Sequence, residues 1–267
     1  MKPALRKARV LLAVWFAHMS AYRAEIVIWM LSGAVPLIML AVWIGKARAS
    51  GGSVQGYTPQ DFGAYFLAAW ITQQWIVAWV AWELSNEIRL GYLSSRLLRP
   101  LDPIWEFGAG HLTERFVRLP FMAMIVGAGL VLVPGTRLTP DVLHALAFVA
   151  CIFVAFAIRF LLAYCIGLLS FWFDQATALD EFYHIIAAFL TGGFAPLSFY
   201  PPAVRAAVEW TPFPYLVYYP VRVLTGAADV SEIVRVLAVQ LGWLGVFWCI
   251  RVLLWRRGLR RYGAVGA

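Results

Sequence analysis

The stretch VLHALAFVACIFVAFAIRFLLAYCIGLLSFW, residues 142–172, decides the fold class of this chain. Its apolar residues run on without the polar and apolar alternation that a lipid-facing β-strand shows. The run is also longer than the roughly 20 residues that a helix needs to cross a membrane. Because backbone groups in lipid must be hydrogen-bonded internally, the stretch predicts a transmembrane α-helix that tilts or projects into water.

The composition extends this prediction to the whole chain. Of the 267 residues, 62% are hydrophobic and only 13% are charged, whereas about a quarter of the residues in soluble proteins are charged. The net charge of +8 lies in short clusters beside apolar runs and forms no separate basic domain. These clusters indicate membrane topology and contact with anionic lipid headgroups rather than nucleic acid. We therefore expect an all-α integral membrane protein with one transmembrane domain over residues 1–267.

Hydropathy predicts six transmembrane helices. Before them, residues 1–24 place apolar side chains on one helical face and basic ones at the start, which favours an interfacial helix over a signal peptide. With the N-terminus inside, fifteen Lys and Arg residues fall on the cytoplasmic side and six on the other, so both termini are predicted to be cytoplasmic. The predicted spans are residues 25–45, 62–84, 112–133, 142–172, 183–199 and 233–254.

Cysteine and histidine give no sign of a metal site. Cys151, Cys165 and Cys249 all lie in apolar stretches without CxxC spacing, so neither a disulfide framework nor a metal site is expected. The histidines are scattered, and His111 with Glu114 is too thin a pair to indicate a site.

Between spans two and three lies WELSNEIRLGYLSSRLLRPLDPIWEFG, residues 82–108. It predicts a short helix across the cytoplasmic membrane face, ended by Pro100 and Pro103. Exposed apolar side chains with a charged rim suit docking into a partner's groove. The alternative is a helix that packs its leucines on lipid and leaves its arginines at the headgroups.

A second irregular segment is FLTGGFAPLSFYPPAVRAAVEWTPFPYLVYYPV, residues 189–221, which holds six of the fourteen prolines. Non-helical backbone at membrane depth survives only when it is buried in protein or lines a wet cavity. We expect two short helices, residues 203–210 and 215–224, that dip into the outer leaflet and turn back. A proline-rich surface loop is the alternative. The residues expected to form an extracellular gate are Gly192, Gly193, Pro196, Pro201, Trp210, Pro212 and Tyr215.

Inside the spans, Arg159 is the most informative residue, because a charge in a membrane helix normally faces water or a partner. It either lines a pathway and attracts an anionic headgroup or pairs with an acidic residue of another span. Trp75, Trp79 and Trp82 follow helical spacing, which favours structural packing over an aromatic wall for a substrate. The adjacent Asp180 and Glu181 are interpreted as a solvated helix start. The residues kept as candidates for a substrate pathway are Arg159, Gln73, Trp75 and Trp79.

Two motifs carry a family resemblance. E-I-R-x-G-x-L over residues 87–93 is followed by L-L-R-P-x-x-P over residues 97–103. Later, G-G-x-x-P-L-x-x-Y-P covers residues 192–201 and W-x-P-F-x-Y-x-x-Y-x-P-V covers residues 210–221. In this order they resemble the permease subunits of type-two ABC exporters, particularly a bacterial subset, and the similarity covers essentially the whole chain.

This resemblance implies a subunit of the bacterial cytoplasmic membrane that dimerises with a second copy or a similar permease. A separate ATP-binding subunit would dock under the loop after span two and bind ATP and Mg, so no cofactor is expected in this chain. Indeed, Gly45-Lys46 lacks the other residues of a phosphate-binding loop. The residues implied to couple to the ATPase are Glu83, Glu87, Arg89, Tyr92, Leu93, Arg96 and Arg99.

The implied function is export of a hydrophobic or amphipathic substrate: a drug, a lipid or a lipid-linked glycan. One alternative is an ATP-independent secondary carrier, but such carriers commonly show inverted repeats and acidic residues near the midplane, and neither is evident here. A lipid-modifying membrane enzyme is disfavoured because the chain shows no set of nucleophile, base and orienting residue.

Overall fold

The computed structural model describes residues 10, 12–17, 28, 33–138 and 141–262. Its regular elements are helices, and the other backbone pairing in these ranges is an isolated β-bridge between Val54 and Tyr57. The predicted all-α class is confirmed. The predicted interfacial helix and the start of the first predicted span fall largely outside the described residues. The helices are α3 (Val35–Ala49), α4 (Pro59–Ile76), α5 (Val80–Arg89), α6 (Leu93–Leu97), α7 (Pro103–Leu132), α8 (Val142–Leu168), α9 (Thr177–Leu190), α10 (Pro202–Glu209), α11 (Phe213–Leu216), α12 (Tyr218–Leu224) and α13 (Val230–Arg261), with 3-10 turns η1 (Leu169–Phe171) and η2 (Leu197–Phe199).

Three described helical stretches are long and apolar enough to cross a membrane: Pro103–Leu132, Val142–Phe171 and Val230–Arg261. Each begins at an aspartate whose carboxylate accepts a hydrogen bond from a backbone N–H of the first turn: Asp102, Asp141 and Asp229. These caps satisfy donors that a helix start otherwise leaves open. Pro103, which we expected to end a helix, occupies the first turn of α7, where a missing N–H costs nothing.

The predicted second span, residues 62–84, is not one helix. α4 ends at Ile76, Val77 takes an extended conformation (φ −55°, ψ 136°), and α5 begins at Val80. No glycine or proline lies at this break, so the sequence carries no local signal for it. Interrupted backbone at membrane depth requires a protein or cavity environment, which directs attention to what surrounds residues 77–79.

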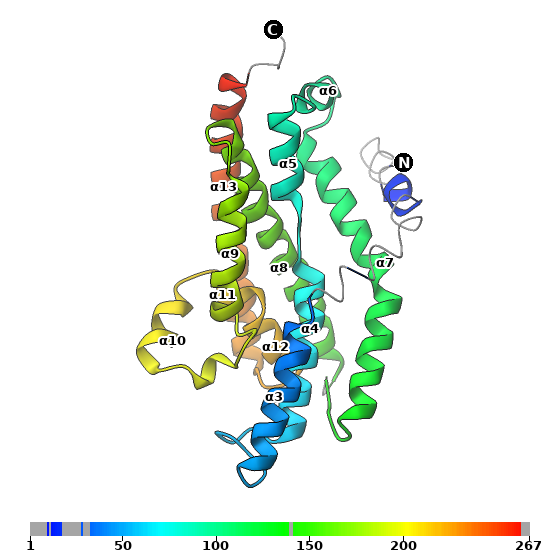
Figure 1. The fold of residues 1–267 in the computed structure, drawn as a ribbon, viewed down its shortest axis with the longest axis vertical. Coiled ribbons are helices and arrows are strands. Elements are labelled where there is room, and N and C mark those ends of the chain that lie inside the picture. Colours follow the sequence, from blue (N-terminus) through cyan, green and yellow to red (C-terminus); the bar gives the residue numbers. More distant parts are fainter. Residues whose placement is uncertain (1–9, 11, 18–27, 29–32, 139–140, 263–267) are drawn as a thin grey trace.

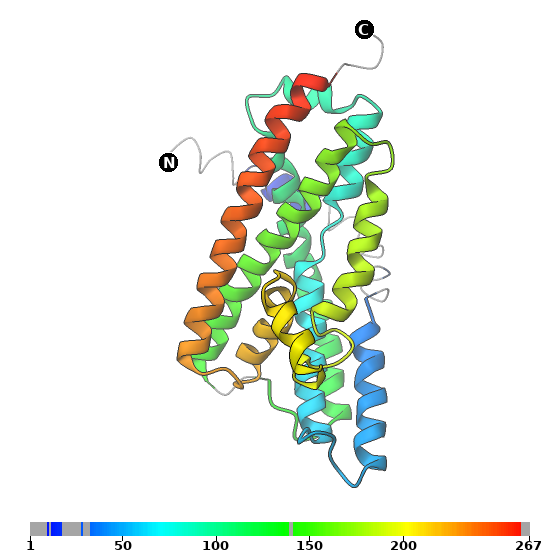
Figure 2. The same cartoon turned by 90° about the vertical axis from the view of Figure 1, so that its left-hand side faces the viewer.

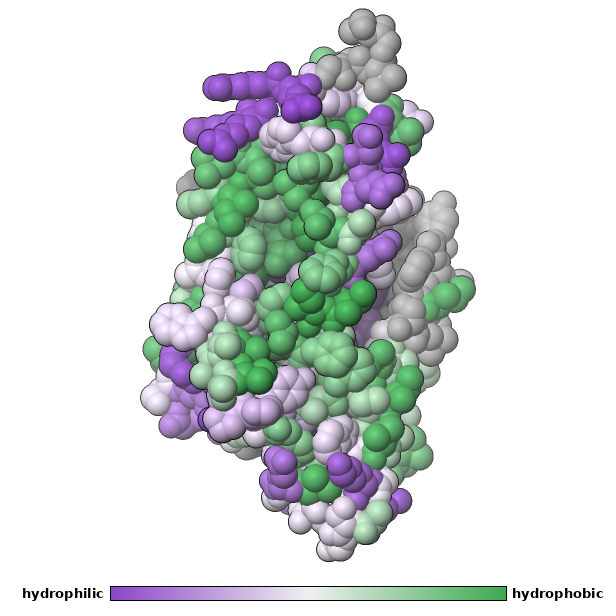
Figure 3. Space-filling view, turned by 60° about the vertical axis from the view of Figure 1, so that its left-hand side comes forward, coloured by the Kyte–Doolittle hydropathy of each residue, from purple (hydrophilic) through white to green (hydrophobic). Residues whose placement is uncertain are grey.

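The longer helices run along the long axis of the molecule (Figure 1). α8 is central: it packs against α13 along much of its length and also contacts α4, α5 and α12 (Figure 2). α6 and the last turns of α13 lie at one end of the long axis, and the loop between α3 and α4 lies at the other (Figure 1). Hydrophilic residues gather mainly toward the ends of the molecule, while hydrophobic ones cover much of the face between them (Figure 3).

The proline-rich segment folds as a series of short helices in the half of the molecule away from α6 (Figure 1). α10 and α11–α12 correspond closely to the two short helices that were predicted. α10 is largely exposed, whereas α12 is buried against α4 and α8. Pro212 and Pro214 lie at the start of α11. The segment therefore returns its second half into the bundle.

Candidate functional site

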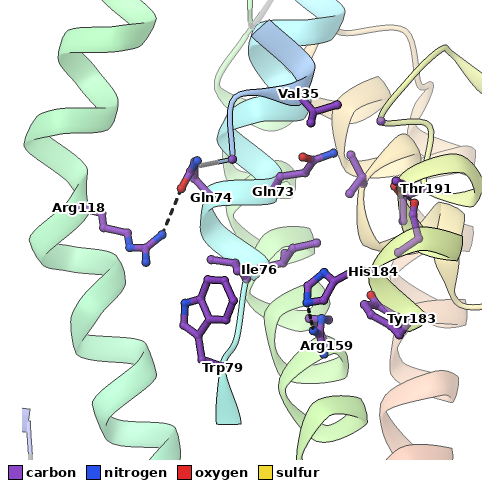
Figure 4. Close-up of a pocket in the computed structure, with 16 residues that line it drawn as sticks. Val35, Gln73, Gln74, Ile76, Trp79, Arg118, Arg159, Tyr183, His184 and Thr191 are labelled. Carbon is purple, nitrogen blue, oxygen red and sulfur yellow. Dashed lines mark hydrogen bonds between the residues drawn. The ribbon is translucent and has the colours of Figure 1, made fainter. Parts of the chain in front are cut away.

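A cavity of about 270 Å³ lies at the break between α4 and α5 (Figure 4). Val77 and Trp79 of the break line it, so the interrupted backbone does face a cavity. Two arginines, one histidine and two glutamines also face it, and its described lining contains no carboxylate. The lining residues are Gly33, Val35, Gln73, Gln74, Ile76, Val77, Trp79, Arg118, Arg159, Tyr183, His184, Ala187, Ala188, Thr191, Gly193 and Val217.

Arg159 comes from α8 and is 2% exposed. Its Nη2 donates to Asp180 of α9 at 3.0 Å and lies 3.2 Å from Nε2 of His184. Its guanidinium stacks 4.2 Å above the Tyr183 ring. Arg159 therefore pairs with an acidic residue of another helix, as one of the two sequence-based alternatives predicts, and it also lines the cavity, while its role in a pathway stays a prediction. Asp180 lies in the first turn of α9 and Glu181 is exposed, as the interpretation of a solvated helix start predicts, but Asp180 itself turns inward to this pair.

The second arginine of the cavity, Arg118, belongs to an ionic stripe on α7 that the sequence analysis missed. Arg118 donates to Glu114 one turn earlier on α7 and to the Gln74 side-chain oxygen of α4 at 3.1 Å. Arg115 pairs with Glu114 at 3.2 Å and stacks 5.4 Å from Phe156. Arg115 and Arg118 are two of the fifteen basic residues that the charge count assigns to the cytoplasmic side, yet they are 0% and 1% exposed. The i, i+3 and i+4 spacing from His111 to Arg118 was the available signal.

The charged groups of the cavity are only partly satisfied. Within the described part of the chain, Nη1 of Arg159 and Nε of Arg118 are buried without a hydrogen-bond partner. Arg115, which is not among the lining residues, likewise makes no guanidinium hydrogen bond in the described part of the chain, although its Nη1 lies 3.2 Å from Glu114. Buried donors of this kind normally have partners, and leaving one open costs about 1–3 kcal/mol. The described residues hold no group of three or more His, Cys, Asp or Glu placed to bind a metal.

The stripe on α7 continues toward α6. His111 Nε2 lies 3.0 Å from Glu83 of α5. Nearer the start of α7, Glu106 is one of two carboxylates that bind Arg96 of α6. Arg96 donates through Nε and Nη2 to Glu87, at 2.6 Å each, and through Nη1 to Glu106 at 2.5 Å. Burial opposes the charge of Arg96, but the hydrogen bonds and charges of Glu87 and Glu106 outweigh it and raise its pKa.

The remaining residues of the predicted coupling segment divide into buried and exposed. Leu93, the first residue of α6, is fully buried, whereas Tyr92 is 63% exposed and Leu98 is 88% exposed. Arg89 is exposed, and Arg99 donates to Glu106 at 2.9 Å. Leu93 therefore anchors α6 to the bundle, and Tyr92 and Leu98 present the apolar surface at this end of the molecule.

Among the aromatic pathway candidates, only Trp79 reaches the cavity. Trp75 packs edge-on against Phe116 and Phe153, with ring centroids 6.0 and 5.1 Å away. Trp82 is 62% exposed. Because the helix is interrupted at residues 77–79, the three tryptophans do not keep helical spacing and form no common stripe. Gln73, by contrast, lines the cavity.

The predicted gate residues are spread over the proline-rich segment. Gly192 follows the end of α9 with φ +86°, and Tyr65 of α4 donates to its carbonyl oxygen at 2.8 Å. Gly193 lines the cavity. Pro196 and Tyr215 are buried, Pro201 and Trp210 are exposed, and Pro212 is half-buried. The structure thus brings Gly193 to the cavity but leaves Pro201 and Trp210 on the surface.

Comparisons with curated proteins and with solved structures gave no match. A family profile described as "ABC-2 family transporter protein" matches residues 13–266. That match covers nearly all of the chain and agrees with the resemblance carried by its motifs. The chain belongs to the ABC-2 family of transporter proteins and is a transmembrane transport subunit.

Proposed function

We propose that this chain is the permease subunit of an ATP-driven exporter of amphipathic substrates. An ATP-binding subunit, which carries ATP and Mg, docks on the end of the molecule formed by α6. Its movement reaches the cavity and opens a path away from that end. The observation that carries the proposal is the row of charged residues on α7, which contacts Arg96 of α6 through Glu106 and lines the cavity with Arg118.

This row of charged residues on α7 contacts three other helices. Glu106, His111, Glu114 and Arg118 lie at successive turns of α7, and they contact α6, α5 and α4 in turn. A displacement of α6 therefore acts on a rigid helix whose other contacts lie at the cavity. Coupling of distant sites requires an element with two arrangements, and the break at residues 77–79 provides a joint between α4 and α5.

The proposal extends to the surroundings of the chain. α6 and the end of α13 lie at the same end of the molecule (Figure 1), which we assign to the cytoplasm of a bacterium on the Lys and Arg bias. The proline-rich segment then lies toward the outer side, where its buried half suits a re-entrant gate. A second permease, identical or similar, would complete the pathway within lipid.

The test targets the exposed apolar side chains of the α6 end. Tyr92→Asp and Leu98→Asp should abolish co-purification of an ATP-binding subunit or reduce substrate-stimulated ATP hydrolysis at least tenfold, because a charge is costly in an apolar interface. Ser53→Asp, in the exposed loop at the opposite end, is the matched control. Leu93 is unsuitable because its burial makes any change there a test of folding. Full, coupled activity of both α6 variants would count against the proposal.

A further inference from the structure

We infer that the cavity is a binding site for the acidic headgroup of an amphiphile, a phosphate or a carboxylate. This inference rests on the proposed function in naming the substrate, but the binding it predicts needs no ATP-binding subunit. It goes beyond family membership, which says nothing of substrate charge.

The first argument is the sign of the lining. Arg118, Arg159 and His184 reach the cavity from three different helices, α7, α8 and α9. Their acidic partners Glu114 and Asp180 are not among the described lining residues, so the carboxylates stand behind the guanidinium groups. A ligand in the cavity therefore meets hydrogen-bond donors first, as an anion requires.

The second argument is the open donors. Arg159 is 2% exposed and Arg118 is 1% exposed, and among the described residues nothing accepts from Nη1 of the first or Nε of the second. Buried donors normally have acceptors, and these two open donors belong to side chains that line the cavity. An oxyanion supplies several acceptor oxygens at once, and Gln73 and Gln74 add side-chain amides to the same cavity.

The third argument is size and surroundings. Sites for whole drug-sized molecules enclose about 300–1,000 Å³, so a cavity of about 270 Å³ suits a headgroup better than a complete lipid. Apolar side chains such as Ile76, Ala187 and Val217 form the rest of the wall. On α9, Ile185 and Phe189 are 63% and 54% exposed, so an alkyl tail has an apolar surface to follow next to the cavity.

The experiment measures binding to the full-length chain in nanodiscs of zwitterionic lipid. Radiolabelled dodecyl phosphate is the probe, and unlabelled dodecanoate, dodecyltrimethylammonium and dodecyl maltoside compete with it at matched tail length. We expect saturable binding that dodecyl phosphate or dodecanoate displaces at concentrations at least tenfold lower than the cationic and neutral amphiphiles. The ratio of the two acids tells phosphate from carboxylate.

Two variants assign the binding to the cavity. Arg159→Gln with Asp180→Asn removes both charges of the pair, so that no buried carboxylate is left alone. Gln73→Glu adds one negative charge to the half-buried lining with almost no change in shape. Each should weaken dodecyl phosphate binding at least tenfold. Arg137→Gln, an exposed arginine in the loop after α7, controls for loss of surface charge.

The outcomes separate this inference from the proposed function. Equal competition by all three headgroup types, or unchanged binding in both cavity variants, would overturn the acidic-headgroup site. If Gln73→Glu instead favoured dodecyltrimethylammonium, the assignment of charge selection to the cavity would gain direct support. Failure of an ATP-binding subunit to co-purify would contradict the proposed function and leave this binding result intact.

Discussion

Two arginine clusters at different depths of the molecule differ in how many guanidinium nitrogens have a hydrogen-bond partner. At the α6 end, Arg96 uses all three guanidinium nitrogens on Glu87 and Glu106. At the cavity, Arg159 uses one nitrogen on Asp180 and keeps another buried without a partner among the described residues. The more accessible cluster, where water could compensate for a missing contact, is complete, while the deeper one is not.

This difference is consistent with a structural role for the cluster at α6 and with the ligand-binding role that we infer for the cluster at the cavity. A complete bidentate contact fixes geometry, which suits the coupling role that we propose for α6. An incomplete buried donor is a cost that the fold carries until something occupies the cavity. The difference between the clusters can be tested by measuring how much each contributes to the stability of the fold. A second measurement asks whether a ligand in the cavity changes that contribution.

The largest effect is expected at the deeper cluster. Arg159→Gln leaves Asp180, whose side chain is 13% exposed, without its guanidinium, and breaking a buried ion pair from one side costs about 3–5 kcal/mol. Thermal unfolding in detergent should show a large fall in midpoint. The double variant with Asp180→Asn should recover most of it, because no lone buried charge remains.

Comparison of the single and double variants also tests the interaction between Arg159 and Asp180. If Arg159→Gln and the double variant were equally destabilised, Asp180 would not depend on Arg159 and the pair would be incidental. Addition of dodecyl phosphate should stabilise the wild-type chain and leave the double variant unchanged, since a ligand that binds only the folded state stabilises it.

A smaller effect is expected at the α6 end. Arg96→Gln removes charge-assisted hydrogen bonds, and because the side chain is 19% exposed, water compensates in part. We expect a loss of about 2 kcal/mol, confined to local opening of residues 90–101 and visible as faster amide exchange there. Arg96→Lys should restore little, because an ammonium cannot reproduce the fork. Unchanged exchange in Arg96→Gln would show that Leu93 alone holds α6.

The sequence predicts the parts of this fold that depend on local composition. Residues 142–172 and 233–254 are long apolar runs, so their helices follow from hydropathy, and the short helices around residues 203–224 follow from proline placement. The break at residues 77–79 does not, because its residues are ordinary helix formers and only the surrounding cavity makes an interruption stable. Of the two cavity arginines, the sequence singles out only Arg159, which is the one charge in a long apolar run. Arg118 cannot be told from a surface charge by sequence, because its partner Gln74 comes from a different helix.

The smallest effect concerns the glycine beside the cavity wall. Gly192 has φ +86°, and a Cβ there would lie 2.6 Å from the Tyr65 hydroxyl. Gly192→Ala should therefore cost about 1–2 kcal/mol, from the left-handed backbone and from displacing a buried tyrosine that donates to the same residue's carbonyl. Gly45→Ala, in α3 with nothing within 4 Å of the new Cβ, is the control and should be neutral or stabilising by about 0.5–1 kcal/mol. If the thermal midpoint fell equally in both variants, the contact between α4 and the end of α9 would have no special role. If only Gly192→Ala fell and its dodecyl phosphate binding also weakened, the position of α9 would be shown to set the cavity that Arg159 and His184 share.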